Sequence, residues 1–179
     1  MKIRIMTIAG LAFLLVSTAG AQTKFTRTLQ CSKGDPSYSI EVTDHPGHTY
    51  TLVKDTCKWT SDTVINGLKI TDDTGVATGE ASATKSTATG SRVATMDNGD
   101  KLFVSVHDSS PVKDNMPTDI EGTFTFTGGT GKMKGIKGKG TYKVTPAADG
   151  TAAVTVEGEY TMPAAVAPKA VTPKPKPTE

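Results

Sequence analysis

Along most of the chain, apolar residues recur at every second position, which is the pattern of β-strands with one buried and one exposed face. Phe124 and Phe126, for example, alternate with threonines. The same spacing marks further extended runs at 25–31, 38–42, 50–52, 92–96, 101–107, 138–145 and 154–160. Residues 81–90 are rich in threonine and alanine and carry little apolar pattern, so strands at 64–70 and 76–83 have no clear boundaries. The pattern predicts about eight or nine short strands and no helix in the mature chain.

Turn signals separate these runs. Asn98-Gly99 lies between two extended runs and is a strong hairpin signal, and Asp149-Gly150 occupies a similar position near the C-terminal end. A sheet without helices must bury its apolar face on itself, as a closed barrel or a sandwich. Closure also removes exposed strand edges. We therefore expect an all-β, antiparallel closed barrel.

The two ends of the chain differ from the middle. Two positive residues, an apolar run at 8–16 and Ala19-Gly20-Ala21 predict a cleaved signal peptide over 1–21. The apolar run is short for a membrane span and no second one follows, so membrane insertion is not expected. A proline-rich segment, 163–179, predicts an extended, disordered tail. A single β-barrel domain over 22–162, periplasmic or secreted, remains.

Export gives the two cysteines a meaning. In an oxidising compartment a lone pair of cysteines normally forms a disulfide, so we expect Cys31 and Cys57 to be bonded. The alternative, a redox-active pair, lacks the close Cys-x-x-Cys spacing that tunes thiol acidity.

The charge balance argues against polyanionic partners. The whole chain has a formal charge of +2, but the domain over 22–162 contains 15 Lys and Arg against 17 Asp and Glu, a net charge of −2. It has no overall basic field to attract nucleic acid, so we expect no nucleic-acid partner. Five lysines between 132 and 143 are the local exception, and we expect them at the edge of a hairpin, with an anion site as the alternative.

The histidines do not form a recognisable metal or catalytic motif. His45 and His48 flank a Pro-Gly turn rather than sharing one face of a helix, so no metal site is expected. If Val104 and Val106 face inward, alternation sends His107 outward, which weakens it as a catalytic base.

Other catalytic motifs are also missing. Gly131-Lys132 ends a glycine-rich stretch, but Phe126 and Met133 occupy the positions where a phosphate-binding loop requires Gly and Ser or Thr. No serine sits in a nucleophile-elbow motif, and no carboxylate pair can be identified from the sequence. We expect no cofactor and assign no catalytic residue.

Several segments together resemble the allene oxide cyclase barrel-like family, which includes the plant dirigent proteins. They are GTFTFTGGTGK at 122–132, MKGIKGKGTY at 133–142, EGEY at 157–160 and the upstream DNGDKLF hairpin at 97–103. The resemblance covers about 92–162 and implies an eight-stranded antiparallel barrel. Many members trimerise, so it also implies a homo-trimer. It implies no cyclase activity, because no cavity residue of the family can be matched to a position in this chain.

The glycines in these segments suit a scaffold role. Gly128, Gly129 and Gly131 allow positive φ angles and close backbone approach at a barrel corner, and Gly138 and Gly140 suit a bend where side chains would collide.

An eight-stranded barrel is just wide enough to be filled by side chains or to hold one small ligand. We favour an exported barrel that binds a small apolar ligand. An enzyme that uses the same cavity for cyclisation or isomerisation is the first alternative, and an oligomeric envelope protein with a filled interior is the second. The candidate cavity-lining residues are Phe124, Phe126, Tyr142, Val156 and Tyr160.

Overall fold

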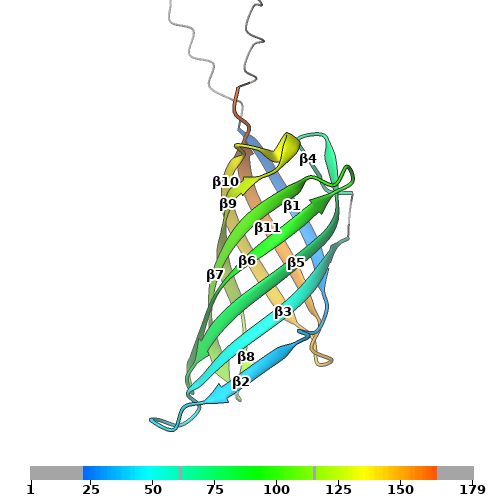
Figure 1. The fold of residues 1–179 in the computed structure, drawn as a ribbon. Coiled ribbons are helices and arrows are strands. Elements are labelled where there is room, and N and C mark those ends of the chain that lie inside the picture. The colour runs from blue at the N-terminus through cyan, green and yellow to red at the C-terminus, as the bar shows by residue number, and fades with distance from the viewer. Residues whose placement is uncertain (1–21, 61, 115, 165–179) are drawn as a thin grey trace, which may run out of the picture.

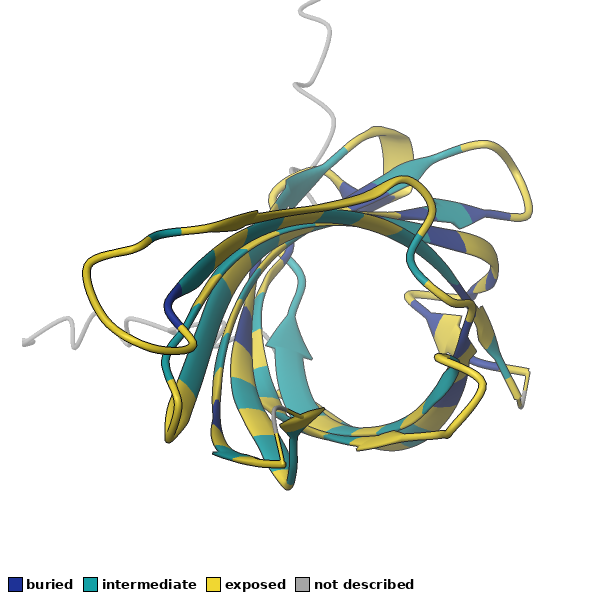
Figure 2. Ribbon diagram, turned by 90° about the horizontal axis from the view of Figure 1, so that it is seen from below, coloured by how far each residue is buried: buried dark blue, intermediate teal, exposed yellow. Residues whose placement is uncertain are grey.

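The computed structural model describes residues 22–60, 62–114 and 116–164. Eight long strands within these ranges form an antiparallel sheet that closes on itself (Figures 1 and 2). They are β1 (Thr23–Cys31), β3 (Thr49–Trp59), β5 (Leu68–Ala81), β6 (Lys85–Met96), β7 (Lys101–Lys113), β9 (Ile120–Gly129), β10 (Lys137–Pro146) and β11 (Ala152–Thr161). Around the barrel the order is β3-β1-β11-β10-β9-β7-β6-β5, and β5 pairs with β3 to complete the ring. The predicted all-β, antiparallel eight-stranded closed barrel is confirmed.

Shorter elements decorate the described part of the barrel. They are the strands β2 (Ser37–Glu41), β4 (Val64–Ile65) and β8 (Met116–Pro117) and the single turn of 3-10 helix η1 (Gly131–Met133). In Figure 1, β4 and η1 lie at the upper end, and β2 and β8 lie towards the lower end. The predicted signal peptide at 1–21 lies outside the described residues, as does nearly all of the predicted tail.

Two strands, β1 and β2, pair with different parts of the same edge of β3. At its C-terminal end β3 pairs with β1, where Cys31 lies opposite Cys57, and at its N-terminal end it pairs with β2. β1 also pairs with β11 along its whole length, whereas the pairings of β2 in the described chain are with β3 alone. The ring therefore closes between β1 and β3 through only three residue pairs, from Leu29 with Trp59 to Cys31 with Cys57, and β2 takes over the same edge of β3 below them.

The upper end of the barrel holds the main hydrophobic core. Met133 and Ile136, from η1 and the residues after it, are fully buried and pack against Ile65, Met96 and Leu102. These side chains close the upper end. The middle and lower parts of the barrel contain fewer fully buried residues, which leaves room inside the wall.

The region without an apolar pattern is fully part of the sheet. β5 and β6 pair from Ile70 with Met96 as far as Ala81 with Ser86, so both strands run into residues 81–90. β5 and β6 are each paired on both edges. These long-range hydrogen-bonded pairings hold the two strands in place where the local sequence has no apolar alternation. The expected strands at 64–70 and 76–83, whose boundaries the sequence does not define, thus become β4 and one long strand, β5.

The glycine-rich corner behaves as predicted. Gly131 has a φ of +48° and Gly128 a φ of +154°, both in the range that favours glycine. A Cβ on Gly140 would lie 2.1 Å from the carbonyl oxygen of Glu157, so a side chain there would collide with backbone. The neighbouring Lys137 and Lys139 are exposed on β10, but β10 is paired on both edges, so the expectation of a hairpin edge is wrong.

No helix in the described residues is long and apolar enough to cross a membrane.

The predicted disulfide is confirmed. Cys31 and Cys57 lie directly opposite each other on β1 and β3, and their sulfur atoms are bonded. Together with Leu29 they form a small buried cluster on which Trp59 packs. The bond therefore fastens the first strand of the barrel to the strand that closes it.

Loss of this bond is expected to destabilise the fold. Cross-linking residues 26 apart in sequence removes chain entropy from the unfolded state worth about 3.5 kcal/mol. Urea unfolding in the presence of a reductant should show a drop of about that size in the free energy of unfolding. A Cys31→Ala/Cys57→Ala variant should have a lower free energy of unfolding than the oxidised protein, and reductant should not change it. Equal stability of the oxidised and reduced proteins would contradict this assignment.

Candidate functional site

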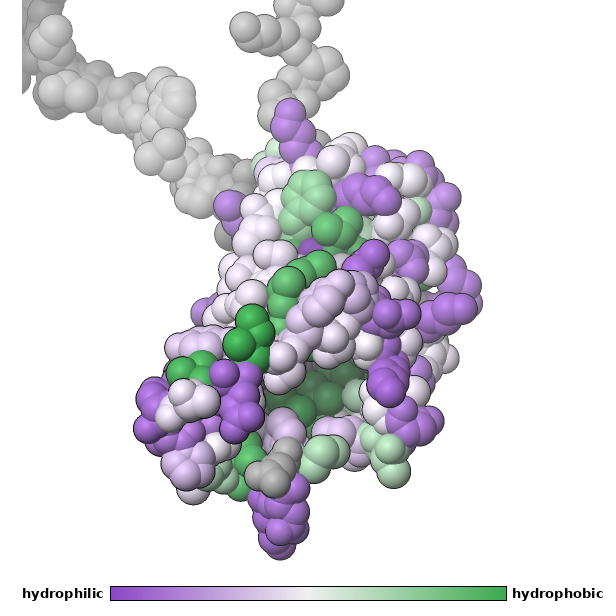
Figure 3. All heavy atoms as spheres, turned by 60° about the horizontal axis from the view of Figure 1, so that its bottom comes forward, coloured by the Kyte–Doolittle hydropathy of each residue, from purple (hydrophilic) through white to green (hydrophobic). Residues whose placement is uncertain are grey.

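The barrel encloses a cavity of about 300 Å³. Its wall is largely apolar and includes Val53, Val106 and Val154 towards the lower end. Figure 3 looks towards that end and shows a recess with apolar side chains at its floor. The cavity therefore lies below the closed upper core.

Most of the predicted lining residues lie on this cavity. Phe124, Phe126, Tyr142 and Val156 are part of its wall. Tyr160 is not among the lining residues; it packs against the upper core, and its hydroxyl accepts a hydrogen bond from the Asn66 backbone N–H at 3.2 Å. Binding of a ligand by any of them stays a prediction.

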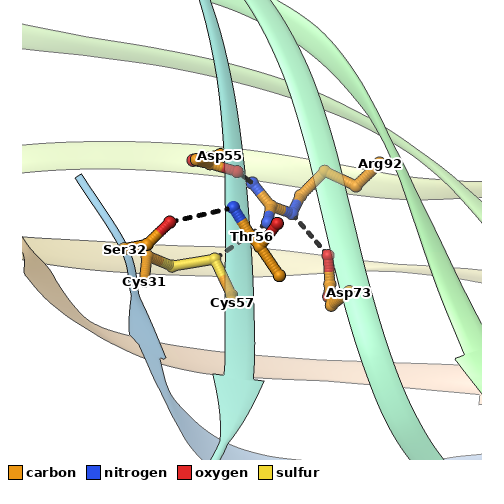
Figure 4. Close-up of a disulfide and its surroundings, with 7 residues drawn as sticks. All are labelled: Cys31, Ser32, Asp55, Thr56, Cys57, Asp73 and Arg92. Carbon is orange, nitrogen blue, oxygen red and sulfur yellow. Dashed lines mark hydrogen bonds and ion pairs between the residues drawn. A yellow bond between two sulfur atoms is a disulfide. The ribbon is translucent and has the colours of Figure 1, made fainter. Parts of the chain in front are cut away.

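Charged residues that the sequence analysis did not identify also face this cavity. One of them is Arg92 on β6: its Nη1 is 2.8 Å from Asp55 Oδ1 on β3, and its Nε donates to Asp73 Oδ1 on β5 at 2.8 Å (Figure 4). Nη2 donates to the sulfur of Cys57 at 2.8 Å. The residue opposite Arg92 on β5 is Gly75, where a Cβ would lie 2.5 Å from Nη1. Glycine at that position leaves room for the guanidinium.

Burial decides the electrostatics of this group. The Asp73 side chain is only 6% exposed, and loss of solvation raises its pKa, although Arg92 acts in the opposite direction. Burial alone would lower the pKa of Arg92, but the charges and hydrogen bonds of Asp73 and Asp55 raise it overall. Arg92 is therefore a permanent cation whose removal would leave a buried carboxylate without its partner.

A second polar pair lies across β7, β9 and β10. The hydroxyl of Tyr142 donates to Asp108 Oδ2 at 2.8 Å. Gly122 on β9 lies between the two residues in register, and a Cβ there would be 2.3 Å from the Tyr142 ring. Burial raises the pKa of Asp108, against the opposing effect of this hydrogen bond, and burial with the nearby Asp108 charge raises the pKa of Tyr142.

Trp59 adds a polar atom to the wall. Its Nε1 is buried and makes no hydrogen bond within the described chain, although the indole helps to lower the pKa of Asp73. A buried N–H normally has an acceptor, and this effect on Asp73 shows that the Asp73 carboxyl is within reach of the indole.

Part of this polar set follows from strand alternation. Asp108 shares its face of β7 with Val104 and Val106, and Arg92 shares its face of β6 with Ala94. Alternation could have identified both as inward-facing. Asp73 could not be found in this way, because a β-bulge between Ile70 and Asp72 changes the alternation of β5.

The histidines lie away from the cavity. His107 is exposed on the outer side of β7, as alternation predicts. His45 and His48 lie on the connection between β2 and β3, and neither lines the cavity.

Comparison with known proteins supports the fold only. No family model matches the chain, and no curated protein is similar to it in sequence. Among solved structures, a protein of unknown function from the DUF3224 family of Shewanella oneidensis has a TM-score of 0.51 at 13% identity, covering 80% of this chain and 100% of its own. The pterocarpan synthase dirigent protein GePTS1 has a TM-score of 0.49 at 12% identity, with coverages of 86% and 98%. A second such protein, PsPTS1, has a TM-score of 0.48 at 14% identity, with coverages of 79% and 95%.

At 13% identity, the likeness to the DUF3224 protein supports the barrel fold alone. The finer resemblance to the allene oxide cyclase-like family stays a prediction.

The ion-pair cluster gives a pH-dependent prediction. Arg92→Met should lower the free energy of unfolding by about 3–5 kcal/mol at neutral pH, because Asp73 is left buried and charged. A carboxyl with a raised folded-state pKa loses stability as pH rises through that pKa, so the deficit should narrow as pH falls towards about 4.

Urea unfolding of both proteins at neutral and acidic pH measures this difference. Asp55→Asn and Asp73→Asn, added to Arg92→Met, should restore part of the loss. Lys139→Met, an exposed change on β10, should stay within about 0.5 kcal/mol of the unmodified protein. A deficit that is the same at both pH values and is not relieved by the asparagines would contradict the buried ion pair.

Proposed function

We propose that this protein is an exported barrel that binds one small, predominantly apolar molecule in its cavity. The observation that supports this most directly is the cavity of about 300 Å³, whose apolar wall carries a few polar groups at fixed positions. Small-molecule sites have this composition, and the volume is at the lower end of their usual range. An open interior also favours ligand binding over the alternative of a filled envelope protein.

The polar groups suggest the chemistry of the ligand. The cavity wall carries three carboxyl groups, those of Asp55, Asp73 and Asp108, and one guanidinium, that of Arg92. The Asp108 carboxyl can accept a hydrogen bond from a hydroxyl on the ligand. A neutral molecule with an aromatic or aliphatic body and one or two oxygen atoms fits best, and an anion fits poorly.

The compartment is part of the proposal. A disulfide persists in an oxidising environment, which supports the periplasm or the exterior of the cell. The homo-trimer implied by the family resemblance remains a proposal, and native mass spectrometry of protein exported by its own host would report both subunit number and any retained molecule.

A matched pair of dyes tests the cavity. N-phenylnaphthylamine is neutral and becomes fluorescent in apolar surroundings, whereas anilinonaphthalenesulfonate has the same aromatic body with a negative charge. The neutral dye should bind at one per chain and accept excitation energy from Trp59, the single tryptophan of the chain. The anionic dye should bind at least about tenfold more weakly, since carboxylates outnumber the guanidinium.

Variants locate the dye. Val106→Phe reduces the cavity and should weaken binding of the neutral dye by about tenfold or more. Val76→Phe makes the same change at an exposed position on β5 and should leave binding unchanged. Thermal unfolding checks that both variants fold. Binding that both variants affect equally, or no saturable binding at all, would refute a cavity ligand.

The pair formed by Asp108 and Tyr142 favours an enzyme as a second candidate. A carboxyl with a raised pKa beside a phenol hydroxyl can act as a general acid towards an oxygen atom in the cavity. The corresponding reaction class is cyclisation or isomerisation of an unsaturated epoxide.

Turnover of such an epoxide, followed by chiral product analysis, tests this candidate. Asp108→Asn should reduce the rate by about 100-fold or more while binding of the neutral dye persists. Product formation no faster than in buffer would leave the protein as a binding barrel.

A further inference from the structure

The connection between β2 and β3 brings together three groups that commonly bind metals. Asp44 Oδ1 is 2.7 Å from His48 Nδ1 and 3.1 Å from His45 Nδ1, and the three ligand atoms all lie within 4.8 Å of one another. We propose that this loop binds one divalent transition-metal ion of the zinc class through Asp44, His45 and His48. The site is distinct from the cavity, because none of the three residues lines it.

Local sequence explains how a turn can assemble this group without a helix. The Asp44 carboxylate accepts a hydrogen bond from the His45 backbone N–H at 2.8 Å, which fixes the start of the turn. Gly47 has a φ of +74°, so the chain reverses sharply between the histidines. The two imidazole rings stack, with centroids 4.4 Å apart and planes 18° from parallel. Helical spacing is therefore not needed to place the histidines together.

A neighbouring strand holds one of the ligands in place. His48 is buried, with 7% of its surface exposed, and its Nε2 is 3.1 Å from Glu80 Oε1 on β5. Donation from Nε2–H to Glu80 fixes the orientation of the ring, and donation from Nδ1–H to Asp44 accounts for the 2.7 Å contact, so a metal ion would bind Nδ1 by displacing that proton to solvent. The Tyr50 ring packs against the His48 ring, with the two ring centroids 5.2 Å apart. A buried, oriented histidine with a carboxylate behind it is the usual arrangement of a metal ligand.

The donor set selects the kind of metal. Two imidazole nitrogens and one carboxylate oxygen suit zinc-class ions, whereas calcium and magnesium prefer sites made of oxygen alone. Ligand atoms around a tetrahedral zinc ion lie about 3.3 Å apart, given metal–ligand distances of about 2.0–2.1 Å. The two contacts of Asp44 are 2.7 and 3.1 Å, and no two ligand atoms are more than 4.8 Å apart, so the ion requires side-chain shifts of up to about 1.5 Å. Asp44 and His45 are half exposed and can make those shifts, with the fourth position left to water.

Metal uptake by the tag-free full chain tests the proposal. Equilibrium dialysis against Zn²⁺ should show one ion per chain, and Co²⁺ should give the intense visible absorption of a four-coordinate site. A tenfold excess of Ca²⁺ should not compete. No stoichiometric uptake of Zn²⁺, or displacement of Zn²⁺ by Ca²⁺, would overturn the site.

Variants separate this site from adventitious binding. His48→Ala and His45→Ala should each weaken Zn²⁺ binding by at least about 100-fold, and Glu80→Gln by about 10- to 100-fold. His107→Ala removes the remaining histidine of the chain, which is exposed on β7, and should have no effect.

His45 is exposed, so His45→Ala keeps the test valid if His48→Ala does not fold. Unchanged binding in His45→Ala, or equal losses in His45→Ala and His107→Ala, would refute the assignment.

Discussion

Closure of the sheet through β3 is the constraint on which the rest of the structure depends. β3 pairs with β5 on one edge and with β1 and β2, one after the other, on its other edge. The pairing of this strand with both β5 and β1 closes the ring. Without that pairing the apolar inner faces would have no common interior, because the described residues include no α-helix that could cover them. The Cys31–Cys57 bond lies at the point where β3 changes partner from β1 to β2.

The ion-paired residues of the interior lie next to this disulfide. Asp55 is two residues before Cys57 on β3, and the guanidinium of Arg92 contacts both Asp55 and the disulfide sulfur. Burying such an ion pair carries a desolvation penalty that a packed apolar cluster would avoid. Stability alone therefore does not account for the cluster. The proposed ligand site would account for it, because fixed charges and donors give direction to an otherwise apolar wall.

Glycine residues make both proposed sites possible, in two different ways. In the cavity, small residues at Gly75 and Gly122 leave space for the large polar side chains of Arg92 and Tyr142. In the loop between β2 and β3, Gly47 permits the sharp reversal that stacks two histidines. Glycine thus determines where functional side chains can meet, and the cross-strand register determines which ones do.

Much of the architecture follows from the sequence alone. Alternation of apolar and polar residues, the Asn98-Gly99 turn and the absence of helical periodicity are local properties, and they predicted an antiparallel barrel. The disulfide was predicted separately, from the export signal and the presence of just two cysteines. Alternation also placed Phe124 and Phe126 on the inner face and His107 on the outer one. These features depend on residues close together in the chain, so a single sequence is sufficient to recognise them.

The chemistry of the interior was decided only by the tertiary structure. Arg92 meets Asp55 and Asp73 through the registers of β3, β5 and β6, and a one-residue bulge in β5 turns Asp73 inward against the simple alternation. His48 meets Glu80 across 32 residues of chain. Register and bulges arise from how whole strands pair with one another, and no local pattern of residue types records that pairing.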